Sequence, residues 1–88
     1  MPENLLKTVF KKLFLTDKFI LDENTASAFR IGSFDEVISK FKSKRDLSRF
    51  LASIKQYNGV RFYSLAFQFK VSVEAMAIRL EELELFLF

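Results

Sequence analysis

Neither cysteine nor histidine occurs among the 88 residues of this chain. Without cysteine there can be no disulfide scaffold and no thiolate site. Without histidine, the usual zinc hydrolase sites and the Ser-His and Cys-His catalytic pairs are excluded. Only carboxylates, lysines, hydroxyls and tyrosines remain, and they form no recognisable constellation. We therefore expect no catalytic residue, no metal and no cofactor, and we keep a carboxylate- or lysine-based enzyme only as a remote alternative.

Glycine and proline are also scarce, with two and one residues respectively. Few sharp turns are therefore expected, which favours helices joined by short connections. No apolar run approaches the 18 or so residues that a membrane-spanning helix needs, and lysines interrupt the first apolar stretch, unlike a signal peptide. These features predict a cytoplasmic chain with no membrane partner.

Hydrophobic residues, by contrast, make up 50% of the chain, and 12 of them are phenylalanine. A chain of this size buries only about 60–65% of its unfolded surface. Because each buried aromatic ring removes roughly 150–250 Å² from water, the composition offsets that handicap. We expect residues 1–88 to form a single domain with its own core.

Apolar spacing and capping residues predict where the helices begin. Leucine and phenylalanine recur on one helical face between Leu5 and Phe14. Asp22 is a candidate N-cap, and Ser33 with Glu36 forms a capping box. Asp46 is predicted to cap the next helix.

The second half of the chain is less uniform. Asn58-Gly59 is predicted to end the helix that begins near Asp46. Val60–Tyr63 fits either a short strand or the start of a helix. Ser72 is the predicted N-cap of a last helix at about Val73–Leu83. The fold class expected is all-α, a compact bundle of four or five helices, with one short strand or hairpin as an option.

The run Leu65–Leu83 predicts a helix–turn–helix-like pair at the C-terminal end. A small Ala66 would let the two helices approach closely, Phe69 and Val71 would fill the angle, and Ser72 would start the second helix. A plain helical hairpin is the alternative. Such DNA-binding units often have glycine where this chain has Lys70.

Charge is unevenly distributed along the chain. Residues 31–70 carry eight basic and three acidic groups, whereas residues 71–88 carry one basic and four acidic groups. The second helix of the pair offers Arg79 against Glu74, Glu81 and Glu82, which is a poor match to a phosphate groove. This charge balance argues against direct DNA recognition by that helix.

Two segments are candidate sites for a partner or for nucleic acid. A basic cluster could grip phosphates or an acidic protein surface, although such a run is commonly a solvated turn. The apolar C-terminal end would be adhesive if exposed, and would either fold back on the core or meet a partner. The candidate residues are Lys40, Lys42, Lys44, Arg45, Arg49, Leu85, Phe86 and Phe88. Tyr57, Arg61, Phe62 and Tyr63 also mix aromatic and cationic groups as single-strand binders do, but we expect these rings to pack in the core.

The C-terminal quarter resembles the C-terminal part of ImmA/IrrE-type metallopeptidases. The family's motif is leucine-alanine, a spacer ending in Phe, Val-Ser, an alanine, Arg-Leu and often Leu-Gly-Leu. The matching residues here are Leu65-Ala66, Phe69, Val71-Ser72, Ala75, Arg79-Leu80 and Leu83-Glu84-Leu85. The family's His-Glu-x-x-His zinc site has no counterpart, so the resemblance implies no peptidase residue. It implies a helical, helix–turn–helix-like module, associated in that family with repressor cleavage, mobile elements and stress regulation.

The leading hypothesis is a non-catalytic, regulatory interaction module that binds a protein partner or itself as a homodimer. The runner-up is a small helix–turn–helix DNA-binding transcriptional regulator, with nucleic acid as the partner.

Overall fold

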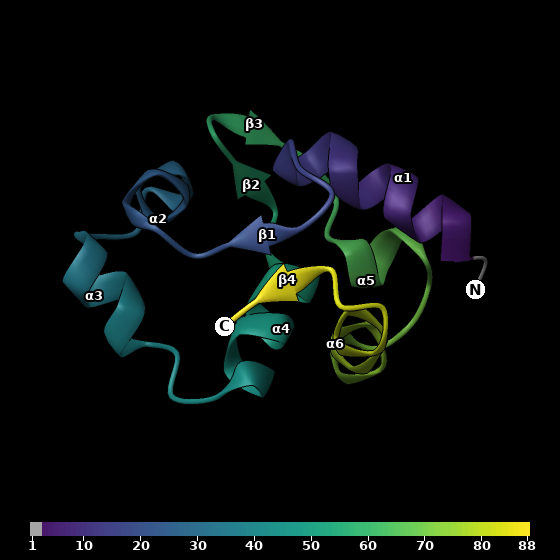
Figure 1. The fold of residues 1–88 in the computed structure, drawn as a ribbon. Coiled ribbons are helices and arrows are strands. Elements are labelled where there is room, and N and C mark those ends of the chain that lie inside the picture. The colour runs from purple at the N-terminus through teal and green to yellow at the C-terminus, as the bar shows by residue number, and fades with distance from the viewer. Residues whose placement is uncertain (1–2) are drawn as a thin grey trace.

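The computed structural model of this chain describes residues 3–88, which form six helices and four strands of two residues each, in the order α1-β1-α2-α3-α4-β2-β3-α5-α6-β4 (Figure 1). The helices are α1 (Glu3–Phe14), α2 (Glu23–Phe29), α3 (Phe34–Ser39), α4 (Lys44–Ser53), α5 (Leu65–Gln68) and α6 (Val73–Glu82). The strands are β1 (Phe19–Ile20), β2 (Gln56–Tyr57), β3 (Val60–Arg61) and β4 (Phe86–Leu87). The predicted compact, mostly helical fold is confirmed. The structure has six helices where four or five were expected, and the shortest of them, α5, is a single turn.

Side-chain oxygens start the helices largely where the capping residues predicted. Asp22 and Ser33 each form a complete capping box, with Thr25 and Glu36 respectively, and Ser72 accepts a hydrogen bond from the Ala75 N–H at 3.0 Å. The expectation for α4 was wrong. Its N-cap is Ser43, whose hydroxyl accepts a hydrogen bond from the N–H of Asp46, the residue predicted as the cap.

The Asn58-Gly59 pair forms a hairpin turn and does not end α4. Both residues have positive φ, 52° and 83°, and they connect β2 to β3 in an antiparallel pair with Tyr57 opposite Val60. The left-handed conformation predicted for this pair is therefore present, but it matches a tight two-residue hairpin loop. Helix α4 ends at Ser53, and the ambiguous Val60–Tyr63 segment begins as a strand.

A second, parallel pair joins distant parts of the chain. Strand β1 lies beside β4, with Phe19 opposite Phe86 and Ile20 opposite Leu87 (Figure 1). Phe19 and Phe86 are buried, whereas Ile20 and Leu87 are about half exposed. The short strand that the sequence allowed as an option is thus present at the C-terminal end, as β4. It brings the C-terminal segment back onto the residues that follow α1.

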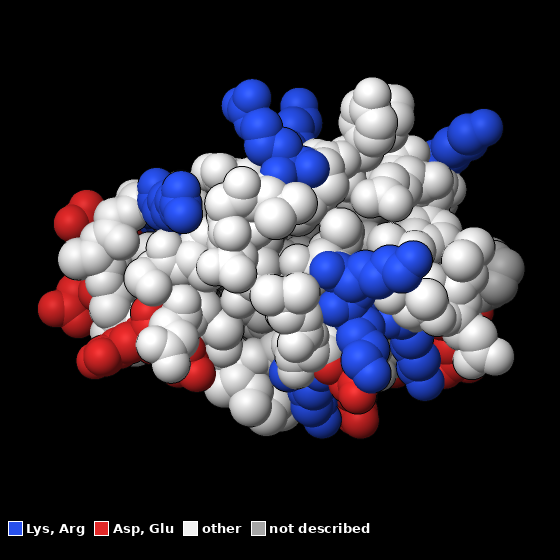
Figure 2. Space-filling view, turned by 90° about the horizontal axis from the view of Figure 1, so that it is seen from above, with Lys and Arg blue, Asp and Glu red and all other residues white. Residues whose placement is uncertain are grey.

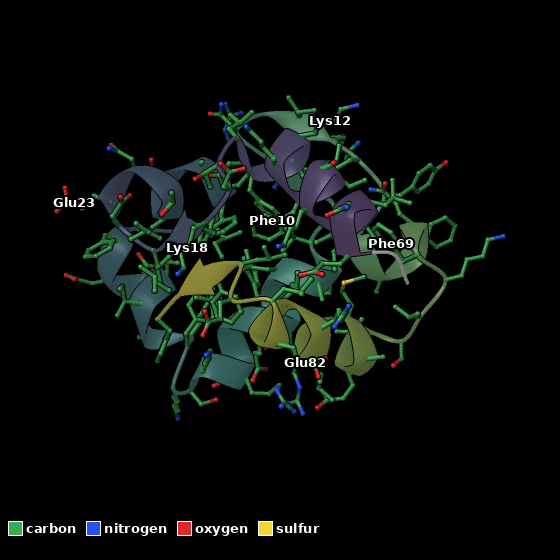
Figure 3. The ribbon with its side chains drawn as sticks, turned by 45° about the vertical axis from the view of Figure 1, so that its right-hand side comes forward. Phe10, Lys12, Lys18, Glu23, Phe69 and Glu82 are labelled. Atoms are coloured by element: carbon green, nitrogen blue, oxygen red, sulfur yellow. The ribbon has the colours of Figure 1, made fainter. Side chains whose placement is uncertain are left out.

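Aromatic rings from α1, β1, α2 and β2 meet in the core. The Phe14 ring lies 5.8 Å from that of Phe19 and 5.3 Å from that of Tyr57, and the Phe29 ring lies 5.3 Å from that of Tyr57. Phe10 extends from α1 into the interior, as Figure 3 shows, and is fully buried. Tilted and edge-to-face arrangements of this kind add to the stabilisation that burial provides.

Among residues 3–88, five non-glycine residues adopt positive φ, and two of them terminate helices α5 and α6. Lys70 has φ 56° and Glu84 has φ 52°. After α5, the Val71 N–H donates to the Ala66 carbonyl at 3.0 Å; after α6, the Leu85 N–H donates to the Leu80 carbonyl at 3.2 Å. These six-to-one bonds define Schellman ends, where glycine is the favoured left-handed residue.

None of the helices in residues 3–88 is long and apolar enough to cross a membrane.

Replacing Lys70 by glycine should stabilise the fold. The left-handed conformation costs about 1–2 kcal/mol for a residue with a Cβ, and the extra unfolded-state freedom of glycine offsets about 0.5–1 kcal/mol of that gain. We therefore expect Lys70→Gly to raise the free energy of unfolding by about 0.5–1 kcal/mol and the Tm by about 3–6 °C. Lys40, an exposed lysine with φ −75° at the end of α3, provides the matched control. Lys40→Gly should not raise the Tm in the same thermal scan.

Candidate interaction surfaces

A cluster of charged side chains joins α4 to α6. The Arg45 guanidinium donates to the Glu81 carboxylate and, at 2.6 Å, to Glu74 Oε1. Arg49 donates to the other Glu74 oxygen at 2.7 Å, and the buried Ser48 hydroxyl donates to Glu81 Oε2 at 2.7 Å. Two residues of the predicted basic cluster are therefore paired with carboxylates of the same chain.

These contacts change the protonation chemistry of both carboxylates. The hydrogen bond from Arg45 is the largest cause that lowers the pKa of Glu81, and the hydrogen bond from Arg49 is the largest that lowers the pKa of Glu74. Partial desolvation opposes both shifts. A carboxylate whose pKa is lower in the folded state stabilises the fold when ionised. The cluster therefore contributes stability above the unfolded-state pKa of about 4.5, and that contribution is lost as the pH falls from there through the lower folded-state pKa.

The variant Glu81→Gln tests this pH dependence. At about pH 7 it should be less stable than the wild type, because Arg45 and Ser48 lose an ionised acceptor. At about pH 3 the gap should narrow, because the carboxyl group is then protonated in the unfolded wild-type chain, and ionising it on folding offsets part of the stabilisation that the ion pair provides. Urea unfolding at both pH values measures the two gaps. Glu82→Gln is the control: Glu82 is exposed and pairs only loosely with Arg79, at 3.8 Å. A gap of equal size at both pH values for Glu81→Gln would contradict this account.

The solvent-facing side of α6 is nearly neutral. Glu74 and Glu81 face α4, and Met76, Ala77 and Leu80 are buried. The exposed or half-exposed residues on the other side are Ala75, Ile78, Arg79 and Glu82. The net negative charge of this helix is thus explained by its contact with α4, and its free face offers a single cation.

The other residues of the basic cluster differ from one another in their surroundings. Lys40 and Lys42 are exposed at the connection between α3 and α4. The Lys44 ammonium lies 5.8 Å from the centre of the Phe86 ring, a cation–π geometry at the start of α4. The five cations therefore have different surroundings: two are ion-paired, one lies beside an aromatic ring and two are exposed.

The candidate residues of the C-terminal segment also differ from one another in burial. Leu85 and Phe86 are buried in the core, whereas Leu87 and Phe88 are 48% and 63% exposed. Ile20 of β1, which pairs with Leu87, is also exposed. The outward side of the β1–β4 pair thus exposes the apolar residues Ile20 and Leu87, and the exposed Phe88 follows Leu87 at the C-terminal end. These three residues are called the apolar patch below, and Ile20 carried no signal in the sequence that would place it there.

A second apolar feature lies beside the β2–β3 hairpin. Tyr57 is buried and Phe62 packs against the core, as expected, but Tyr63 is 70% exposed. Its ring stacks on that of Phe67, which is 66% exposed, with centroids 5.0 Å apart and planes 26° apart. The i, i+4 spacing of these two rings was the available signal, but Phe67 was not among the expected site residues.

On the face that carries α1 and the hairpin, most of the surface is neither acidic nor basic; Lys and Arg are scattered over it, and Asp and Glu lie toward its edges (Figure 2). Lys12 extends outward from α1 on the side away from Phe10 (Figure 3).

Within residues 3–88, no group of three or more carboxylates is placed to hold a metal ion. No family model, no curated protein and no solved structure matches the chain.

Proposed function

We propose that this chain is a non-catalytic protein-interaction module that associates with a second copy of itself through β4. The observation that carries this proposal is the two-stranded β1–β4 sheet, which ends in an apolar, exposed residue pair. A two-stranded sheet is only marginally stable alone and is commonly extended by further strands.

The backbone of β4 supports the proposal first. The Phe19 N–H donates to the Leu85 carbonyl at 2.8 Å. In a parallel pair, every second residue of a strand bonds to the neighbouring strand, so the N–H and C=O of Phe86 are directed away from β1. Within residues 3–88 no third strand joins this sheet. An open edge of this kind is a template for another strand.

The outward side chains support it second. Ile20, Leu87 and Phe88 form the apolar patch beside that edge. Two β4 strands related by a two-fold axis would run antiparallel edge to edge, which places the patches of the two copies side by side, as an isologous interface allows. Two marginal pairs would then become one four-stranded sheet, with apolar surface removed from water on both copies.

We further propose that α5 and α6 form a helix–turn–helix-like pair related to the C-terminal part of ImmA/IrrE-type metallopeptidases. We also propose that the module is regulatory and comes from a mobile element, a setting in which that family is found. Two residues support the kinship. Lys70 lies where such units often have glycine, and Glu84 lies where the family often has Leu-Gly-Leu. Both have the positive φ that glycine accommodates best.

Recognition of duplex DNA by α6 is the second candidate function. The exposed Lys40 and Lys42 favour it, because they are available for phosphates. The free face of α6 disfavours it, since Arg79 is its single cation and is paired with Glu82. Base recognition in a major groove usually depends on several donor side chains of the second helix.

The variant Leu87→Asp tests the self-association proposal without opening the core, because Leu87 is about half exposed. Light scattering coupled to gel filtration should give about twice the chain mass of 10.3 kDa for the wild type and the single mass for the variant. The reason is that each variant chain would place a carboxylate beside the apolar patch of the other copy, and partial burial of an unpaired charge is unfavourable.

Leu5→Asp is the matched control, since Leu5 is a leucine of similar exposure, 51%, on α1. It should remain dimeric. A monomeric wild type at millimolar concentration, or an unchanged mass for Leu87→Asp, would refute association through β4.

A further inference from the structure

The stacked Tyr63 and Phe67 rings form one wall of a groove that contains two cations. The groove has a volume of about 570 Å³ and is lined by Lys55, Arg61, Phe62, Tyr63, Ser64 and Phe67. None of these lining residues is acidic. From this combination we propose that the groove binds single-stranded nucleic acid, with bases stacking on the two rings and phosphates meeting Lys55 and Arg61.

The exposure of the two rings is the first argument. They are the two most exposed aromatic side chains among residues 3–88, at 70% and 66%, in a fold that buries Phe10, Phe14 and Phe19 almost completely. Burying a ring of this size is worth about 1.5–3 kcal/mol. The fold forgoes that stabilisation at two positions four residues apart, which places two flat surfaces side by side in solvent.

The geometry of the rings is the second argument. Their planes are within 26° of parallel and both side chains are largely exposed, so aromatic surface remains available for a base to stack on. The backbone beneath them is well anchored. Ser64 caps α5 by accepting from the Phe67 N–H at 3.2 Å, and Gln68 Nε2 donates to the Tyr63 carbonyl at 2.6 Å. A preorganised platform of this kind loses little conformational entropy when a base stacks on it.

The placement of the cations is the third argument. The hairpin holds Lys55 and Arg61 together, because the Phe62 N–H donates to the Lys55 carbonyl at 2.9 Å and Arg61 pairs with Gln56. Both cations are exposed. Aromatic rings beside cations satisfy the two parts of a single strand, its bases and its phosphates. A duplex fits less well, since its bases are already stacked on each other.

The experiment is fluorescence anisotropy with the full chain and a labelled oligothymidylate of about twelve nucleotides at low salt. The wild type should bind it, and should bind a duplex of the same length more weakly. Tyr63→Ala and Phe67→Ala should each weaken binding about tenfold, the size expected for one lost base–ring contact, whereas Tyr63→Phe should bind within about twofold of the wild type. Lys55→Ala and Arg61→Ala should each reduce the slope of log affinity against log salt by about 0.7.

Three controls make the result decisive. Lys42→Ala removes an exposed lysine from a different surface and should leave single-strand affinity nearly unchanged. Leu87→Asp should also retain binding, which separates this groove from the dimer surface. The ring variants should keep the wild-type Tm, because the rings are exposed. Failure to bind the oligonucleotide, equal binding of the duplex, or affinity that is independent of both rings would each overturn the proposal. Equally tight, ring-dependent binding of a polyglutamate peptide would also overturn it, by assigning the groove to an acidic polypeptide.

Discussion

Arg45 lies between two carboxylates of α6, and this contact determines which surfaces of the molecule are free. It turns Glu74 and Glu81 toward α4 and holds Ser48 and Arg49 in the same cluster. Because the charges on both helices are used in packing, the free face of α6 is nearly neutral. The acidic composition of this helix is therefore explained by its partly exposed contact with α4, and is not evidence about a partner.

The surfaces that remain lie on short elements with few backbone bonds of their own. Strand β4 is held by β1 and by the burial of Leu85 and Phe86, which leaves Leu87 outward. The hairpin is held by Tyr57 and Phe62, which leaves Arg61 and Tyr63 outward. In both cases alternation along an extended segment anchors one residue in the core and presents the next to solvent. The rigid helical core thus supports two separate interaction surfaces.

Much of the local structure was predictable, because it depends on residues close together in the sequence. The capping boxes at Asp22 and Ser33 and the cap at Ser72 act over three residues, and all are present. Errors arose where two local options compete. Ser43 and Asp46 are both good caps, and Asn58-Gly59 suits a helix end and a hairpin equally well. The turn was decided by Val60 pairing with Tyr57, a contact that capping rules do not consider.

The sequence alone predicted the helical character of the chain and showed that it has enough apolar residues for a core. It also excluded chemistry that depends on cysteine or histidine. The tertiary structure decided what each candidate residue does. Arg45 and Arg49 became part of an ion-paired contact, Phe86 entered the core, and Tyr63 and Phe67 were left outside it. The physical reason is that helix formation depends on neighbours within a few residues, whereas exposure and ion pairing depend on groups that only folding brings together, such as Arg45 and Glu81, 36 positions apart.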